Sequence, residues 1–229
     1  MEKISYVILF VLSSLLQAQF LPEMKQGEVR LNEIGKSPIY YYTGINKPTE
    51  SFDYLQIAQR FELSVKNALL KDVTINRQVL NNTELRSTNF HNTKFRLYVY
   101  QMDLKTKGPG QKVNNFVIEI SDKASENIKI DMKKYRLVIP TSVFFVGIEY
   151  IRNVDNERLT PVNEKNELLI NMDTSNGKYI TCYQPFIGMS PKQGIQINTW
   201  ALTASNKWVL YDYFFPDLTD FAISATVSL

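Results

Sequence analysis

Hydrophobic and polar residues alternate with a period of two along much of the chain, most clearly over residues 221–229. One face of this segment carries Phe221, Ile223, Ala225, Val227 and Leu229, and the other carries Ala222, Ser224, Thr226 and Ser228. Successive side chains of a strand point to opposite faces, so the pattern predicts a half-buried antiparallel strand. Residues 143–151 are apolar on both faces except at Gly147 and Glu149, which predicts a central strand.

Many other segments carry the strand pattern. They are residues 39–43, 61–65, 73–79, 95–100, 115–120, 127–130, 135–139, 167–171, 178–184, 195–202 and 208–213. Turn signals separate them: residues 107–110 are read as a break, Asn176-Gly177 as a tight hairpin, and residues 131–134 as a helical turn that Asp131 caps. Short strands at this spacing predict an all-β fold, an antiparallel jelly-roll-like β-sandwich with at most one or two short helical turns.

Residues 51–72 fit two descriptions. As a helix, the segment would place Leu55, Ala58, Val65 and Leu69 on one face, with Glu62 interrupting it. Because that face is only partly apolar, two strands are favoured and a helix is the alternative. The sequence also predicts which side chains the fold buries. They are Phe95, Leu97, Val99, Tyr135, Val138, Val146 and Ile148.

The first nineteen residues have the composition of an export signal. Lys3 precedes an apolar run over residues 4–16, and Ala18 is a small residue close to the expected cleavage point. The run is shorter than the roughly 20 residues that span a bilayer. We therefore expect residues 1–19 to be a signal peptide and residues 20–229 to form one exported β-sandwich domain in the periplasm, at the outer surface or outside the cell.

Composition narrows the function classes. The hydrophobic fraction is 44%, the charged fraction is 21%, and the formal net charge is +3, an ordinary globular mixture. The charge is not gathered into a basic run, so nucleic-acid binding is not expected. Cys182 and His91 are the single cysteine and the single histidine of the chain. Cys182 is expected to be buried and His91 to lie in an exposed turn, and neither a catalytic thiol nor a clustered metal site is predicted.

Glu149 is the carboxylate that most needs an explanation, because it interrupts an apolar strand. The structural interpretation pairs it with a basic residue such as Arg96 or Arg152. The functional interpretation makes it a sugar ligand or the general acid of a glycan hydrolase, which needs a second carboxylate such as Glu119 or Asp212. The structural interpretation is favoured.

Aromatic residues gather at residues 40–42, at Trp200 and over residues 208–215. Core packing explains them most simply, although an exposed row of rings could stack on sugars, together with the polar loops at residues 86–92 and 154–163. Residues 154–157 are acidic but lack the spacing of a calcium loop, so a solvated turn is expected there.

The segment from Thr93 to Arg152 resembles a known type of module. It combines Lys94-Phe95-Arg96-Leu97 followed by a Gly-Pro-Gly turn, then Asp131-Met132-Lys133-Lys134-Tyr135, Pro140 and Phe145-Val146-Gly147-Ile148-Glu149. This order is similar to β-sandwich modules of exported Gram-negative bacterial proteins that occur beside carboxypeptidase-regulatory-like domains. The resemblance implies a jelly-roll-like sandwich without a known catalytic role. Arg96, Asp131, Tyr135, Pro140 and Glu149 occupy its characteristic positions, as structural corners and strand starts.

These patterns lead to one functional expectation and two alternatives. The expectation is a non-catalytic interaction or structural module of the cell envelope, without a cofactor, without a stable transmembrane span in the mature chain, and with an unknown protein or glycan partner. The first alternative is a carbohydrate-binding module, and the less favoured one is a glycan hydrolase. No catalytic, metal or cofactor residue is assigned, and the ligand-binding residues are left unknown.

Overall fold

The computed structural model describes residues 27–34, 38–46, 54–79, 93–114, 117–122, 125–161, 179–191, 196–211 and 218–229. Several sequence predictions therefore lie outside the described residues. They are the signal peptide at residues 1–19, the loop at residues 86–92 with His91, the strand at residues 167–171, the hairpin at residues 176–177, and Asp212.

Three antiparallel sheets make up the fold. The five-stranded sheet contains β1 (Glu28–Leu31), β16 (Ile223–Ser228), β4 (Ala68–Asn76), β8 (Asn127–Asp131) and β9 (Val138–Ile139). The seven-stranded sheet contains β14 (Trp208–Leu210), β13 (Thr199–Thr203), β3 (Tyr54–Glu62), β10 (Val143–Tyr150), β5 (Thr93–Met102), β6 (Pro109–Lys112) and β7 (Ile118–Asp122). The four-stranded sheet contains β11 (Glu157–Pro161), β12 (Tyr179–Pro191), β15 (Leu218–Phe221) and β2 (Tyr41–Asn46).

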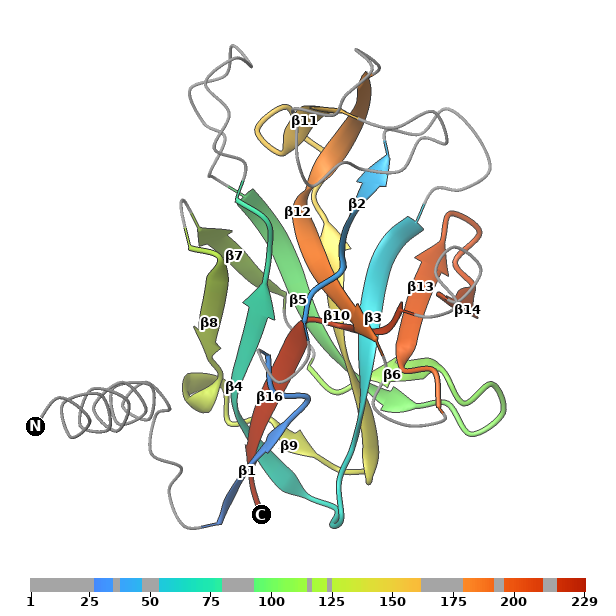
Figure 1. The fold of residues 1–229 in the computed structure, drawn as a ribbon. Helices are drawn as coiled ribbons and strands as arrows, with labels where there is room; N and C mark the ends of the chain where they lie inside the picture. Colours follow the sequence, from blue (N-terminus) through green and yellow to red (C-terminus); the bar gives the residue numbers. More distant parts are fainter. Residues whose placement is uncertain are drawn as a thin grey trace, which may run out of the picture.

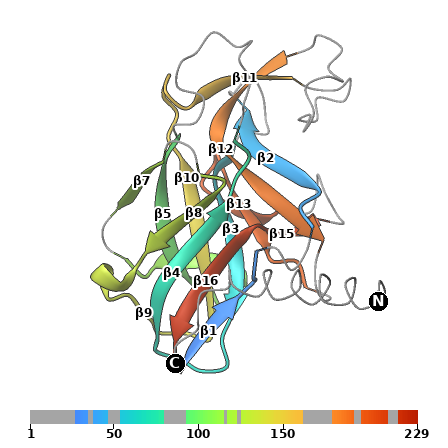
Figure 2. The same cartoon turned by 60° about the vertical axis from the view of Figure 1, so that its left-hand side comes forward.

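The five-stranded and seven-stranded sheets face each other, and the four-stranded sheet lies across one end of them (Figures 1 and 2). A bridge between Arg77 and Ile187 links the end of β4 to β12. The only helical element of the described residues is one 3-10 turn, η2 (Lys133–Tyr135). The fold is therefore the all-β, antiparallel, sandwich-like arrangement that the alternation predicts.

One apolar core lies between the facing sheets. From the seven-stranded sheet it takes Phe95, Leu97, Val99, Phe144, Val146 and Ile148, and from the five-stranded sheet Val73, Ile75, Ile223, Ala225 and Val227; each of these side chains is fully buried. Burying one such aliphatic or aromatic side chain is worth about 1.5–3 kcal/mol. The segment at residues 143–151 is a central strand as predicted, because β10 pairs with β3 on one side and β5 on the other.

The described part of the ambiguous segment, residues 54–72, forms strands and the crossing between them. β3 and β4 belong to different sheets, so residues 63–67 carry the chain across the sandwich instead of closing a hairpin. Asn67 adopts a φ of 61° in this crossing, a left-handed conformation that asparagine tolerates better than most residues. The predicted strand at residues 61–65 is shifted, since β3 ends at Glu62 and Val65 is exposed.

Two burial predictions near η2 are wrong. Val138 is 47% exposed and Tyr135 is only partly buried, whereas Leu137 and Ile139 are buried. The 3-10 turn ends at Arg136 in a left-handed conformation with φ 50°, and beyond it Leu137 and Ile139 point inward while Val138, between them, points outward. The predicted turn itself is confirmed, because Asp131 Oδ1 accepts a hydrogen bond from the Lys133 amide at 2.9 Å.

The C-terminal strand is buried more completely than predicted. Ser224 and Thr226, on its polar face, are only 4% and 3% exposed. Thr226 lies between the longer residues Arg30 and Asp72 of the neighbouring strands, and its hydroxyl donates to Asp72 Oδ1 at 2.9 Å. Small polar side chains can thus be covered by longer neighbours within the same sheet face.

The predicted break at residues 107–110 is also displaced, because β6 already begins at Pro109. The turn between β5 and β6 occupies residues 103–108. Asp103 Oδ1 closes it by accepting hydrogen bonds from the amides of Lys105 and Thr106, at 2.9 and 2.7 Å. Lys107 takes the left-handed conformation, with φ 62°.

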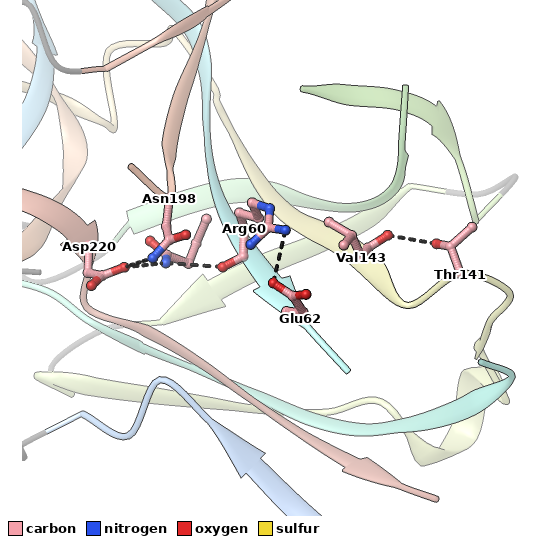
Figure 3. A network of polar contacts seen from close by, with 7 residues as sticks. Arg60, Glu62, Thr141, Val143, Asn198 and Asp220 are labelled. Carbon is pink, nitrogen blue, oxygen red and sulfur yellow. Dashed lines mark hydrogen bonds and ion pairs between the residues drawn. The ribbon is translucent and has the colours of Figure 1, made fainter. Parts of the chain in front are cut away.

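Buried polar groups connect the sheets. Asp220, at the corner between β15 and β16, accepts hydrogen bonds from Gln59 Nε2 at 2.8 Å and Asn198 Nδ2 at 2.9 Å. The Asn198 carbonyl accepts from the Arg60 amide, and the Arg60 side chain pairs with Glu62 at 3.1 Å (Figure 3). These partners satisfy the buried carboxylate and hold the corner against β3.

Asn156 serves a similar purpose before β11. Its side-chain amide accepts from the Lys94 backbone amide at 2.8 Å and donates to the carbonyls of Lys94 and Ile151 at 2.6 and 2.7 Å. The residue is fully buried. It therefore satisfies backbone groups of Lys94 and Ile151 and fixes residues 151–157 to the first residues of β5.

We predict that Asn156→Ala lowers the free energy of unfolding by about 2–4 kcal/mol, because it removes three hydrogen bonds to the backbone at once and leaves a cavity in place of a buried side chain. Urea denaturation followed by tryptophan fluorescence measures the change. Asp155→Ala, at the exposed neighbouring position, is the matched control and should change stability by no more than about 0.5 kcal/mol. Equal stability of the two variants would contradict the role assigned to Asn156.

Candidate binding surface

The seven-stranded sheet carries a second apolar cluster on the face that points away from the sandwich interior. We call this face the outer face. The cluster consists of the buried residues Ala58, Tyr98, Tyr100, Val143, Phe145 and Trp200, with Met102 and Trp208 packed against it and partly exposed. The alternation of β5 explains the placement, because Tyr98 and Tyr100 lie opposite the core residues Leu97 and Val99.

Small residues at the centre of the sheet make room for these rings. Gly147 on β10 pairs in register with Ala58 on β3 and Tyr98 on β5. A Cβ atom on Gly147 would lie 2.7 Å from Cε2 of Tyr100, closer than packed carbon atoms allow. The Tyr100 ring occupies this space, and its hydroxyl donates to Gln56 Oε1 at 2.7 Å.

The turn between β5 and β6 covers one side of the cluster. A Cβ atom on Gly108 would lie 2.6 Å from Cζ3 of Trp200, so the glycine backbone rests directly on the indole. Phe145 meets Trp200 edge to face, with ring centroids 6.2 Å apart. Trp200 is only 8% exposed, and its Nε1 has no hydrogen-bond partner in the described chain.

A row of polar side chains runs across the strands beside the rings. The backbone register places Gln56 (β3), Glu149 (β10), Arg96 (β5) and Glu119 (β7) side by side. Arg96 Nη1 and Glu149 Oε1 form an ion pair at 3.1 Å, and the two side chains are 38% and 25% exposed. Their partial exposure keeps the pair in contact with water, where such pairs add little stability.

Two neighbours complete the electrostatics of this row. The Lys112 ammonium lies 3.7 Å from the ring centroid of Tyr98, a cation–π contact. Burial raises the pKa of Tyr98 to about 12, and the adjacent Glu149 carboxylate adds to the shift. Burial likewise raises the pKa of Tyr100. Both phenols therefore stay protonated at neutral pH and remain hydrogen-bond donors.

The structure places the candidates from the sequence as follows. Glu149 pairs with Arg96, as the structural interpretation predicted, whereas Arg152 donates to the Tyr54 carbonyl. Cys182 is fully buried, as predicted. Tyr40 is 58% exposed and Tyr42 is partly buried. Both lie at the four-stranded sheet, whereas Trp200 belongs to the seven-stranded sheet.

Sequence reasoning missed the aromatic and polar neighbours of Glu149, namely Gln56, Tyr98, Tyr100 and Lys112. The available signal was the alternation of Arg96, Tyr98 and Tyr100 on one face of a predicted strand. Only the strand register brings that face next to Glu149.

The acidic turn at residues 154–157 carries an exposed carboxylate beside a buried amide. Asp155 is exposed, and the Asn156 side chain is engaged by the backbone of Lys94 and Ile151. Within the described ranges, no group of three histidine, cysteine, aspartate or glutamate residues could hold a metal ion. Within the same ranges, no helix is long and apolar enough to cross a membrane.

Comparisons with known proteins do not assign this chain to a family. No family model matches the chain, and no curated protein is similar to it. A solved structure of the cysteine protease and lectin-like domains of Cwp84, a surface layer associated protein of Clostridium difficile, is 10% identical with a TM-score of 0.46. A second structure, of the clostridial cysteine protease Cwp84 after propeptide cleavage, is 13% identical with a TM-score of 0.48.

Each match covers 90% of this chain but only 37% and 41% of the other chains, so this chain spans about two fifths of their length. Both TM-scores are below 0.5, and no conclusion is drawn from them. The resemblance of residues 93–152 to exported modules found beside carboxypeptidase-regulatory-like domains stays a prediction.

We predict that Gly147→Ala destabilises the protein by about 1–3 kcal/mol, because the new methyl group displaces the Tyr100 ring. Thermal and urea denaturation measure the loss, and near-ultraviolet circular dichroism reports the disturbed rings. Ser142→Ala, just before the same strand, is the control and should stay within about 0.5 kcal/mol of the parent. Unchanged stability and spectrum in Gly147→Ala would show that the ring is not confined.

The raised pKa of Tyr98 predicts a loss of stability at high pH. The phenol ionises at about 12 in the folded protein and near its ordinary value of 10.0 in the unfolded chain. Between these values the folded state retains a proton that the unfolded state has released. The contribution of Tyr98 is therefore complete below about pH 10 and is lost as the pH rises towards 12.

Tyr98→Phe should accordingly flatten the decline in the free energy of unfolding between about pH 10 and 12. Urea denaturation at a series of pH values measures this slope in parent and variant. The other tyrosines are common to both proteins, so the difference between the slopes belongs to Tyr98. Identical slopes would contradict the shifted pKa.

Proposed function

We propose that the chain is an exported, non-catalytic β-sandwich module that binds another component of the cell envelope through the outer face of its seven-stranded sheet. The second apolar cluster on that face carries the proposal. The interior of the sandwich already buries the core side chains of both sheets. The outer face carries a further layer with two tryptophans, two tyrosines and a phenylalanine, of which Trp208 stays partly exposed.

The two outer faces of the sandwich differ in chemistry. On the five-stranded sheet, the side chains that point outward include Thr74, Thr226, Asp72 and Lys129, which are small or charged. On the seven-stranded sheet, Trp208, Arg96 and Glu149 remain partly exposed over a layer of aromatic rings. Partly exposed aromatic residues and arginine are the residue types that recur at the centres of binding surfaces.

The edge of the seven-stranded sheet also supports its outer face as the binding surface. β14 is the last strand on one side, and it lies at the periphery of the fold in Figure 1. Its residue Leu210, which faces Trp200 across the strands, is 38% exposed. An apolar side chain left open beside the aromatic cluster extends the surface that a partner can cover.

A hydrolytic role receives less support. A glycosidase needs two carboxylates on opposite sides of a substrate cleft. Here Glu149 is paired with Arg96, and Glu119 lies beyond Arg96 in the same row of one sheet face. The absence of catalysis stays part of the proposal, as does export, which rests on the composition of residues 1–19.

Photo-crosslinking in cells tests this function. A photoreactive amino acid in place of Leu210 should give adducts with an envelope component, because this position lies at the rim of the proposed surface. The same substitution at Lys129, exposed on the five-stranded sheet, is the control and should give few adducts. The processed chain, recovered from the envelope fraction, should begin near residue 20. Equal labelling from both positions, or an unprocessed chain in the cytosol, would overturn the proposal.

A further inference from the structure

We propose that the exposed part of the outer face binds an uncharged, hydroxyl-rich glycan, with Trp208 as the stacking surface and Glu149 and Arg96 as the hydrogen-bonding groups. This inference rests on the proposed function, since it assigns a ligand class to the same surface. Three features of the surface support it: the partial exposure of Trp208, the polar side chains on the same face, and the balance of positive and negative charges there.

Trp208 is the aromatic residue of the cluster that the fold leaves partly open. The other rings, those of Tyr98, Tyr100, Phe145 and Trp200, are buried. Trp208 meets Tyr100 at a centroid distance of 5.5 Å and an interplanar angle of 74°, so the indole is held in a fixed orientation. A fixed, partly exposed indole offers an apolar surface with little loss of side-chain freedom on binding.

Polar side chains with remaining hydrogen-bonding capacity lie on the same sheet face as this ring. The strand register leads from Trp208 through Leu202 and Gln56 to Glu149. Gln56 is only 7% exposed and its Oε1 accepts from the Tyr100 hydroxyl, so it links the rings to the exposed pair of Glu149 and Arg96. Glu149 contributes Oε1 to the ion pair with Arg96, and the Tyr98 hydroxyl interacts with the same carboxylate. Since an ionised carboxylate can accept about four hydrogen bonds, acceptor positions remain for a hydroxyl donor.

The row and its neighbour Lys112 together carry no net charge. Within the row, Glu149 and Glu119 carry two negative charges and Arg96 one positive charge, and Lys112 on β6 adds the second positive charge. A polyanion would meet the two carboxylates, and a polycation would meet Arg96 and Lys112. Hydroxyl groups both donate and accept, so a neutral sugar can use donors and acceptors of either sign.

The same composition favours a glycan over a protein. The cores of protein interfaces are depleted in charged residues, whereas an exposed ion pair lies at the middle of this row. Gln56 and Glu119 are three strand spacings apart, about 14 Å. A ligand that contacts the whole row is therefore extended, as an oligosaccharide is.

Binding measurements with the full processed chain test the inference. The probes are soluble neutral polysaccharides, namely β-glucan, mannan and xylan, with alginate as the anionic comparison, in affinity electrophoresis and calorimetry. At least one neutral polymer should bind, with an affinity that salt does not weaken. Binding to alginate alone, abolished by salt, would overturn the inference in favour of charge attraction.

Substitutions locate the site. Trp208→Ala should weaken binding about tenfold or more, since the stacking surface is lost, while Trp208→Phe retains part of it. Glu149→Gln, which keeps the shape of the side chain, should weaken binding by a similar factor because it removes a charged acceptor. Val209→Ala, the neighbouring exposed position on the opposite side of β14, is the matched control and should bind like the parent.

Thermal denaturation shows that each variant is folded. Undiminished glycan binding by a folded Trp208→Ala variant would overturn the assigned site. If no glycan binds while crosslinks from position 210 lead to a protein, the ligand class is wrong and the proposed function stands. If neither glycan nor crosslink is found, both the ligand class and the proposed function fail.

Discussion

Two small residues at the centre of the seven-stranded sheet determine what its outer face can hold. Ala58 and Gly147 pair in register on β3 and β10, and a Cβ atom on Gly147 would collide with Tyr100. Because these positions lack bulk, aromatic rings from neighbouring strands fill the space above them. The Tyr100 hydroxyl in turn orients Gln56, the first member of the polar row. The aromatic cluster and the polar row are therefore parts of one packed structure.

The interior of the sandwich fixes this surface from below. On β3, Ile57 and Phe61 belong to the main core, whereas Ala58 belongs to the outer cluster. A shift of β3 by one residue would turn its core side chains to the outer face and its outer side chains into the core, so the register is fixed. The contact of Gln59 with Asp220 adds a polar link between β3 and the corner at β15. The side chains of the outer face thus stand on a rigid sheet, which lowers the entropic cost of binding.

The alternation along the chain was sufficient to predict the class of fold and its central strand. It failed at Val138, because the inward positions after the 3-10 turn are Leu137 and Ile139. It also failed where long neighbours cover short ones, as Arg30 and Asp72 do around Thr226. The second effect depends on residues that lie outside the segment whose pattern is read.

The binding surface was less predictable than the fold, because its residues come from strands that are distant in sequence. Glu149 was conspicuous as a charge in an apolar strand, and Arg96 was named as its partner. Nothing local in the sequence places Gln56 on the other side of Glu149 or Trp208 near Tyr100. These neighbours follow from the order β14-β13-β3-β10-β5, in which no two adjacent strands except β13 and β14 are consecutive in the chain. A charged residue in a buried strand therefore indicates where to look, and the strand order determines what lies beside it.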